Sequence, residues 1–148
     1  MGNDLEAGLC YGVSFSEYVE MPWHERDIDE WWAEVHNYVP LYTPFTQEGN
    51  YADGWCGDDP RFTEYYGHKR AWLEENPCPV ECVYAGIYEC CDTILIQKGA
   101  KISTYWAPSS IDVQKLPQPD TSVKDFIVKY MPDMECDEPS WFLYGFYG

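Results

Sequence analysis

Four cysteines lie close together in the middle of the chain, at positions Cys78, Cys82, Cys90 and Cys91. Zinc takes four soft ligands in a tetrahedron, and these ligands usually stand on turns with short spacings between them. The Cys78–Cys82 spacing fits such a turn loosely. The adjacent Cys90 and Cys91 fit it badly, because neighbouring side chains on a strand point to opposite faces. The pattern therefore favours reduced thiols in or beside a sheet, with a metal site at these four cysteines as the alternative.

No other group of residues indicates a particular chemical reaction. Each histidine could activate a cysteine, but no local motif pairs the two residue types. Carboxylate pairs are uninformative in a chain with 26 acidic residues. Asp53, Asp58 and Asp59 lie among glycines, yet the alternating ligands and the closing Glu of a calcium loop are missing. No glycine-rich phosphate loop occurs either. We therefore expect neither catalysis nor a cofactor.

The charge of the chain is more informative than its motifs. The 148 residues include 26 Asp and Glu against 9 Lys and Arg, a net charge of −17, together with 7 Trp, 13 Tyr and 6 Phe. Acidic disordered tails are poor in aromatic residues because they lack the apolar area that offsets chain entropy. We therefore expect a folded protein with a strong negative field. Such a field repels nucleic acid and anionic membranes, and it attracts basic protein surfaces.

The acidic residues are concentrated toward the N-terminus. Residues 1–60 hold 13 acids and one basic residue, a net of −12, whereas residues 61–148 hold 13 acids and 8 basic residues, a net of −5. Such a surface can serve solubility alone. The alternative is that spaced carboxylates replace duplex phosphates in a groove lined by Arg and Lys, with tryptophans as anchors. The predicted partner-binding residues are Glu17, Glu20, Trp23, Glu25, Asp27, Asp29, Glu30, Glu34, Asp53, Trp55, Asp58 and Asp59.

The hydrophobic pattern predicts a single α+β domain over residues 1–148. Segments with strand character fall at 5–15, 80–85, 90–97, 101–106 and 139–148. Turns are expected at Gly86 and at Lys98–Gly99, which makes the three middle strands an antiparallel meander. The continuous apolar run 94–96 predicts that the strand containing it is covered on both faces. We expect one mainly antiparallel sheet of four to five strands.

Apolar residues recur at helical spacing in three segments, at 27–37, 59–76 and 121–131. Each begins at a residue type that caps helices, and prolines or Asn-Pro end the last two. About three amphipathic helices should therefore pack on the sheet. Residues 38–59 read as loop with one short strand at 41–45.

The N-terminal sequence MGNDLEAGLC has neither the basic nor the apolar region of a signal peptide. No apolar run approaches the roughly 18 residues needed to cross a bilayer. Seven cysteines without such a signal favour reduced thiols in a cytosol.

Both ends of the chain resemble known proteins. CYGVSF at 10–15, Pro22-Trp23, DIDEWW at 27–32 and the ending PSWFLYGFYG at 139–148 together resemble small acidic accessory proteins of tailed bacteriophages. The resemblance implies expression in the bacterial host cytoplasm during infection. Phage proteins of this size often inhibit a host enzyme or a defence nuclease, as anti-CRISPR proteins do.

We therefore expect a non-enzymatic inhibitor that mimics nucleic acid and binds a basic groove on a host nucleic-acid-handling protein. The inhibitor itself should bind neither nucleic acid nor a membrane. One alternative is a small metal- or ligand-binding protein that uses the four clustered cysteines or an aromatic pocket. The other is a virion or assembly component whose acidity serves only solubility.

Overall fold

The computed structural model describes residues 5–24, 26–38, 59–87, 90–105 and 112–147. The chain divides into two compact units, one made of Met1–Ile28 with Pro79–Gly148 and the other of Asp29–Cys78. The single domain expected over residues 1–148 stays a prediction. The strand expected at 41–45 lies outside the described residues.

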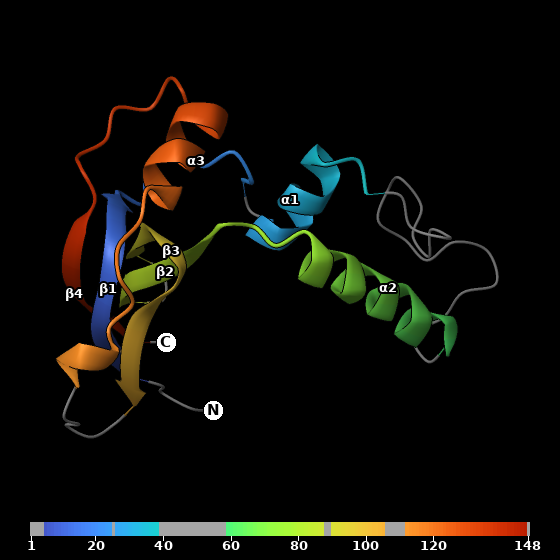
Figure 1. Ribbon diagram of the computed structural model, residues 1–148, viewed down its shortest axis with the longest axis horizontal. Helices are drawn as coiled ribbons and strands as arrows, with labels where there is room; N and C mark the ends of the chain where they lie inside the picture. Colours follow the sequence, from blue (N-terminus) through green and yellow to red (C-terminus); the bar gives the residue numbers. More distant parts are fainter. Residues whose placement is uncertain (1–4, 25, 39–58, 88–89, 106–111, 148) are drawn as a thin grey trace. The chain divides into compact units, whose positions relative to one another are not determined.

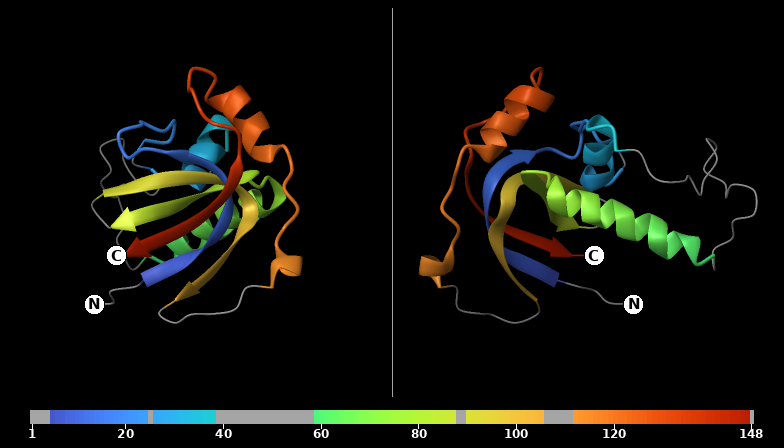
Figure 2. Two further views of the ribbon diagram at one scale, coloured as in Figure 1. Left: turned by 90° about the vertical axis from the view of Figure 1, so that its left-hand side faces the viewer. Right: turned by 45° about the vertical axis from the view of Figure 1, so that its right-hand side comes forward.

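The first unit contains one sheet and one helix. Its described elements are β1 (Leu5–Phe15), β2 (Val80–Ile87), β3 (Cys90–Tyr105), the short 3₁₀ helix η1 (Val113–Lys115), α3 (Ser122–Tyr130) and β4 (Ser140–Tyr147). The strands form a closed sheet in the order β1-β3-β2-β4 (Figures 1 and 2). Three of the pairings are antiparallel. Strand β2 meets β4 in parallel through two residue pairs, Gly86 with Phe146 and Ile87 with Tyr147. The predicted α+β class is confirmed, with a sheet that is partly parallel.

Strand β3 shows that the predicted turn at Lys98–Gly99 is wrong. In a hairpin the two halves would pair with each other, but both halves of β3 pair with β1. The register shifts between Cys10 and Gly12 of β1, because β3 carries extra residues there that have no partner on β1. Gly99 lies in this bulge with φ of +79°, a conformation that glycine adopts without strain. The segment is therefore a bulge within one long strand.

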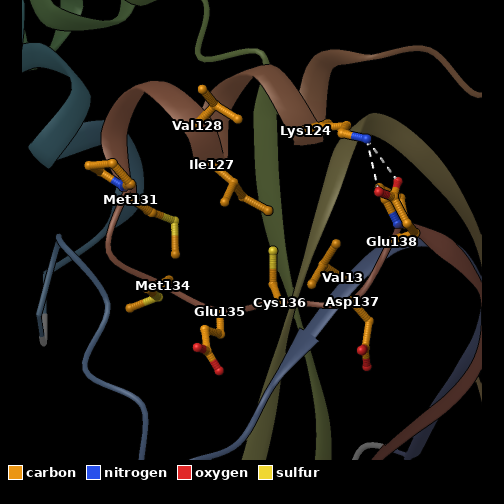
Figure 3. Close-up of a pocket in the computed structure, with 12 residues that line it drawn as sticks. Val13, Lys124, Ile127, Val128, Met131, Met134, Glu135, Cys136, Asp137 and Glu138 are labelled. Carbon is orange, nitrogen blue, oxygen red and sulfur yellow. Dashed lines mark hydrogen bonds and ion pairs between the residues drawn. The ribbon is translucent and has the colours of Figure 1, made fainter.

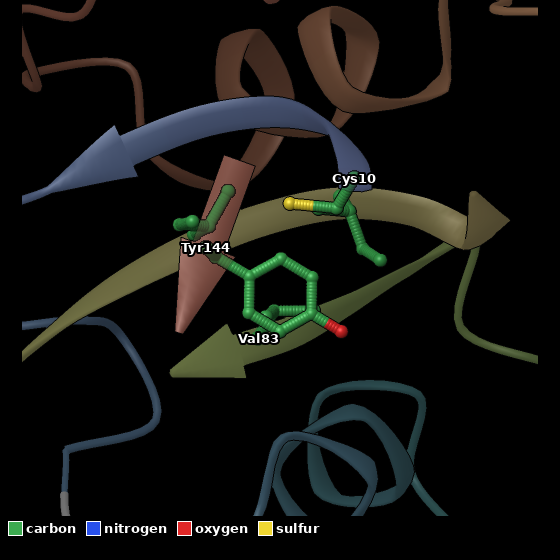
Figure 4. Close-up of a cluster of buried hydrophobic side chains, with 5 residues drawn as sticks. Cys10, Val83 and Tyr144 are labelled. Atoms are coloured by element: carbon green, nitrogen blue, oxygen red, sulfur yellow. The ribbon is translucent and has the colours of Figure 1, made fainter. Parts of the chain in front are cut away.

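One apolar core lies within the closed sheet. It combines side chains from all four strands, namely Cys10, Val83, Ile94, Ile96 and Tyr144. Figure 4 shows Cys10, Val83 and Tyr144 pointing into this shared interior. The Tyr144 hydroxyl donates a hydrogen bond of 2.9 Å to Oε1 of Glu6, so the polar end of the ring is satisfied. Burial raises the pKa of the Cys10 thiol to about 11, which keeps the thiol neutral and unreactive.

A second core lies on the opposite face of β1 and β3. Leu95 of β3 is paired with Val13 of β1, and both side chains are buried. Helix α3 contacts β3 and β2, and its buried side chains are Val123, Phe126 and Ile127. Because Ile94 and Ile96 belong to the first core, this strand is covered on both faces, as its apolar run predicts.

The second unit contains most of α1 (Ile28–Val35) and all of α2 (Arg61–Glu75). The Trp32 indole donates a hydrogen bond of 2.9 Å to the carbonyl oxygen of Asn76, which follows α2. Trp31 and Trp32 are buried. The apolar stripe predicted for α2 is only half-buried, and no residue of this helix is fully buried. No helix within the described ranges is both long and apolar enough to pass through a membrane.

Candidate functional site

The candidate site is the loop of residues 16–24, which follows β1 in the first unit. The buried side chains of Met21 and Trp23 hold this loop in place. The Trp23 ring packs against Phe126 of α3, with ring centroids 6.4 Å apart. A turn follows at His24, whose backbone N–H donates a hydrogen bond of 2.8 Å to the carbonyl oxygen of Met21. The polar side chains of the loop lie before and after these two anchors and are exposed to solvent, namely Ser16, Glu17, Tyr18, Glu20 and His24.

The loop borders an open pocket of about 370 Å³ that residues of β2 and β3 also line. Its polar and aromatic lining consists of Glu17, Tyr18, Glu20, Trp23, His24, Tyr84 and Thr93, and we call this site the acidic pocket. The volume lies within the range of about 300–1,000 Å³ that is typical of small-ligand sites. Among its described lining residues there is no lysine or arginine.

Further carboxylates, those of Asp27 and Asp92, lie near the acidic pocket. The Glu17 backbone N–H donates a hydrogen bond of 3.1 Å to Oδ1 of Asp92, which ties the loop to the beginning of β3. Burial is the main cause that raises the pKa of the Cys91 thiol, and the charges of Glu17 and Asp92 act in the same direction. Burial is also the main cause of the raised pKa of Tyr84, to which Asp27 contributes. The charges of Glu17, Asp27 and Asp92 lie near this end of the sheet and disfavour an anion there.

Two tyrosines expose their rings at the acidic pocket. Tyr18 is 89% exposed and Tyr84 is 48% exposed. A hydrogen bond to Glu17 is the main cause that raises the pKa of Tyr18. Nδ1 of His24 lies 2.7 Å from Oε1 of Glu20 at the surface. Aromatic rings beside carboxylates attract cations, and the planar guanidinium group of arginine suits both kinds of contact. The acidic pocket can therefore bind a Lys or Arg side chain.

The structure brings together part of the predicted partner-binding set. Glu17, Glu20 and Trp23 line the acidic pocket, and Asp27 lies close enough to influence Tyr84. Trp23 was expected to anchor a partner, but it is 3% exposed and forms the floor of the pocket instead of projecting from it. Four predicted residues lie outside the described part of the chain, namely Glu25, Asp53, Trp55 and Asp58.

The remaining predicted residues, Asp29, Glu30, Glu34 and Asp59, belong to the second unit. Glu30 and Asp59 form ion pairs within that unit. Oε1 of Glu30 lies 3.2 Å from Nζ of Lys69, and Oδ2 of Asp59 lies 2.6 Å from Nη2 of Arg61. The predicted acidic residues are thus divided between two units, and the described ones of the first unit, Glu17, Glu20 and Asp27, lie in or near the acidic pocket.

The three clustered cysteines of the first unit, Cys82, Cys90 and Cys91, do not converge on one point, and Cys78 belongs to the second unit. Cys78 is fully buried, whereas Cys90 is exposed. Cys82 is paired with Leu95 and Cys91 with Gly86, four positions further along β2, which separates them by about 13 Å at the usual rise of a strand. Within the described ranges, no three His, Cys, Asp or Glu side chains are arranged to hold a metal ion. The geometry therefore gives no support to the metal alternative.

Sequence reasoning missed Tyr18, His24, Tyr84 and Asp92 as members of the site. The hydrogen bond between Glu17 and Asp92 joins residues that are 75 positions apart. No periodicity or motif links such distant positions. The one available signal was the place of Asp92 near the start of a predicted strand, which indicates that it lies at an end of the sheet.

Comparison of the chain with models of protein families, with curated proteins and with solved structures gave no match. The function is therefore inferred from the acidic pocket and from the charge of the chain.

Proposed function

We propose that this chain is a non-enzymatic inhibitor that binds a cationic groove on a nucleic-acid-handling protein. A Lys or Arg side chain of that groove enters the acidic pocket, and the surrounding carboxylates replace the phosphates of a nucleic acid. The lining of the pocket carries the proposal: it joins the carboxylates of Glu17 and Glu20 to the exposed rings of Tyr18 and Tyr84, and none of its described residues is lysine or arginine.

The charge of the whole chain supports the same function. A net charge of −17 steers a positively charged surface toward the protein and makes association fast and sensitive to salt. Long-range attraction alone does not select a partner. The acidic pocket adds short-range selectivity, because a cation gains both a carboxylate contact and an aromatic contact there.

We infer the biological setting from the resemblance of both chain ends to phage accessory proteins. In that setting the inhibitor acts in the cytoplasm of a bacterial host. Its partner is a basic host or defence enzyme, such as a nuclease, and its mode of action is that of an anti-CRISPR protein. Nucleic acid itself is not the ligand, because the negative field repels a polyanion.

Two double variants with the same change in charge test this function. Glu17→Gln with Glu20→Gln alters the acidic pocket, whereas Glu74→Gln with Glu75→Gln alters two exposed residues of α2 in the other unit. Proteins captured from a nuclease-treated bacterial lysate are identified and purified, and their affinities are measured. We expect the pocket variant to bind its partner about tenfold more weakly, or by about 1.4 kcal/mol, and the α2 variant to bind normally.

Competition with nucleic acid tests the mimicry directly. Excess duplex DNA should displace the inhibitor from the purified partner, because both ligands would occupy the same groove. A complex that persists in excess DNA and responds equally to the two double variants would show that the acidic pocket is not the contact surface.

A further inference from the structure

A second pocket of about 360 Å³ lies in the first unit, beneath α3 and the segment that leads from α3 to β4. We call it the α3 groove. Figure 3 shows its side chains, which come from β1, α3 and the segment before β4. Its apolar lining includes Val13, Ile127, Val128, Met131, Met134 and Cys136. None of these residues lines the acidic pocket.

The interior of the α3 groove is apolar and adaptable. Val13 and Ile127 of the second core are buried, as is Met131, and all three line the groove. The Cys136 side chain points toward Ile127 in Figure 3. Methionine side chains adjust to irregular shapes because they are unbranched and polarizable, and Met134 adds a second one. Such a lining accepts a bulky aliphatic or aromatic side chain.

The rim of the α3 groove is acidic. Glu135, Asp137 and Glu138 belong to it, together with Lys124 as the one cation among its described lining residues. Nζ of Lys124 lies 2.9 Å and 3.1 Å from the two carboxylate oxygens of Glu138, so this cation is already paired. The carboxylates of Glu135 and Asp137 point away from the apolar side chains (Figure 3). They can meet cations of a ligand that lies outside the groove.

We propose that the α3 groove binds a short segment of a partner protein in which one bulky apolar side chain is flanked by Lys or Arg. The apolar side chain enters the groove, and its basic neighbours contact Glu135 and Asp137. Charge complementarity selects this occupant, because an anionic ligand would meet three carboxylates and a single paired lysine. The groove is a separate contact from the acidic pocket and does not depend on it.

The methionines report on the two pockets separately. The chain has four: Met131 and Met134 line the α3 groove, Met21 lines the acidic pocket, and Met1 begins the chain. Protein with ¹³C-labelled methionine methyl groups is titrated with the peptide Gly-Arg-Arg-Phe-Arg-Arg-Gly. The control peptide has Gly in place of Phe and the same charge. We expect the Phe peptide, and not the control, to shift the Met131 and Met134 methyl signals.

Two matched variants then locate the contact. Val128→Lys places a cation in the groove at a residue that is 68% exposed, so folding is spared. Leu143→Lys makes a comparable change at an 84% exposed residue of β4 that does not line the groove. We expect Val128→Lys to weaken binding of the Phe peptide about tenfold and Leu143→Lys to leave it within about twofold.

Several results would overturn the proposal. Equal shifts with both peptides would show only a general attraction to an acidic protein. A shift confined to Met21 would place the peptide in the acidic pocket, which would support the proposed function and refute the α3 groove. An uncharged peptide with Ser in place of Arg that binds as tightly would show that the partner is not basic. Shifts at Met131 and Met134 with none at Met21 would support the α3 groove even if the acidic pocket proved inert.

Discussion

Substitution of Leu95 by Ala tests the packing of α3 on the sheet, on which both pockets depend. Leu95 is fully buried on the face of β3 that carries the second core, on the side opposite Ile94 and Ile96. If this face were open to solvent, as in a sheet covered on one side only, the substitution would lower the free energy of unfolding only slightly. The cost therefore reports whether α3 and the loop of residues 16–24 cover the sheet as the structure shows.

The magnitude follows from the atoms removed. Leucine has three more carbon atoms than alanine, and each buried group contributes about 0.8 kcal/mol, which gives about 2.4 kcal/mol for transfer alone. The cavity left behind adds a further cost, so we expect the free energy of unfolding to fall by about 3–4 kcal/mol. The same substitution at Leu143, which is 84% exposed on β4, should cost about 0.5 kcal/mol or less.

Urea unfolding followed by circular dichroism measures both variants. The dependence of the free energy on urea concentration must stay the same, since a change in that slope would indicate an altered unfolded or native state. Equal costs for Leu95→Ala and Leu143→Ala, or a cost below about 1 kcal/mol for Leu95→Ala, would refute the double coverage of β3.

Two further predictions concern the interiors of the two units. Above pH 9 the Cys10 thiol ionises in the unfolded chain but keeps its proton in the folded protein until about pH 11, so the free energy of unfolding should fall across this range. In Cys10→Ala, the urea midpoint should fall less steeply as the pH rises. A slope equal to that of the unsubstituted protein would contradict the burial of the thiol. Trp32→Phe removes the indole hydrogen bond to Asn76 and should lower the free energy of unfolding in urea by about 1–2 kcal/mol. Trp141→Phe, at a 40% exposed position, should lower it less. Equal losses in the two variants would argue against that hydrogen bond.

Local spacing was sufficient to predict several elements. Val123, Phe126 and Ile127 recur at helical spacing and are the buried residues of α3. The apolar run around Leu95 predicted a strand covered on both faces, and both coverings are present. These predictions succeeded because helix and strand periodicity depend only on neighbouring residues and on which of them are apolar.

Other features were decided by pairings between distant residues. The bulge at Gly99 looked like a turn, because glycine after a lysine favours a hairpin as readily as a bulge. Only the pairing of both halves of β3 with β1 distinguishes the two. The closure of the sheet likewise depends on the two residue pairs between β2 and β4, which no local pattern predicts.

The amino-acid sequence by itself determined the charge of this protein, the class of its fold and the periodicity of its helices, because these follow from composition and from neighbouring residues. The tertiary structure alone decided which acidic side chains form a site. It placed Glu17 beside Asp92, buried Trp23 and left Asp29 in the other unit. It also brought Val13 of β1 under Ile127 of α3 to form the α3 groove. The physical reason is that contacts between residues far apart in the sequence depend on how whole helices and strands pack together. Such contacts cannot be read from the types of single residues or of their neighbours.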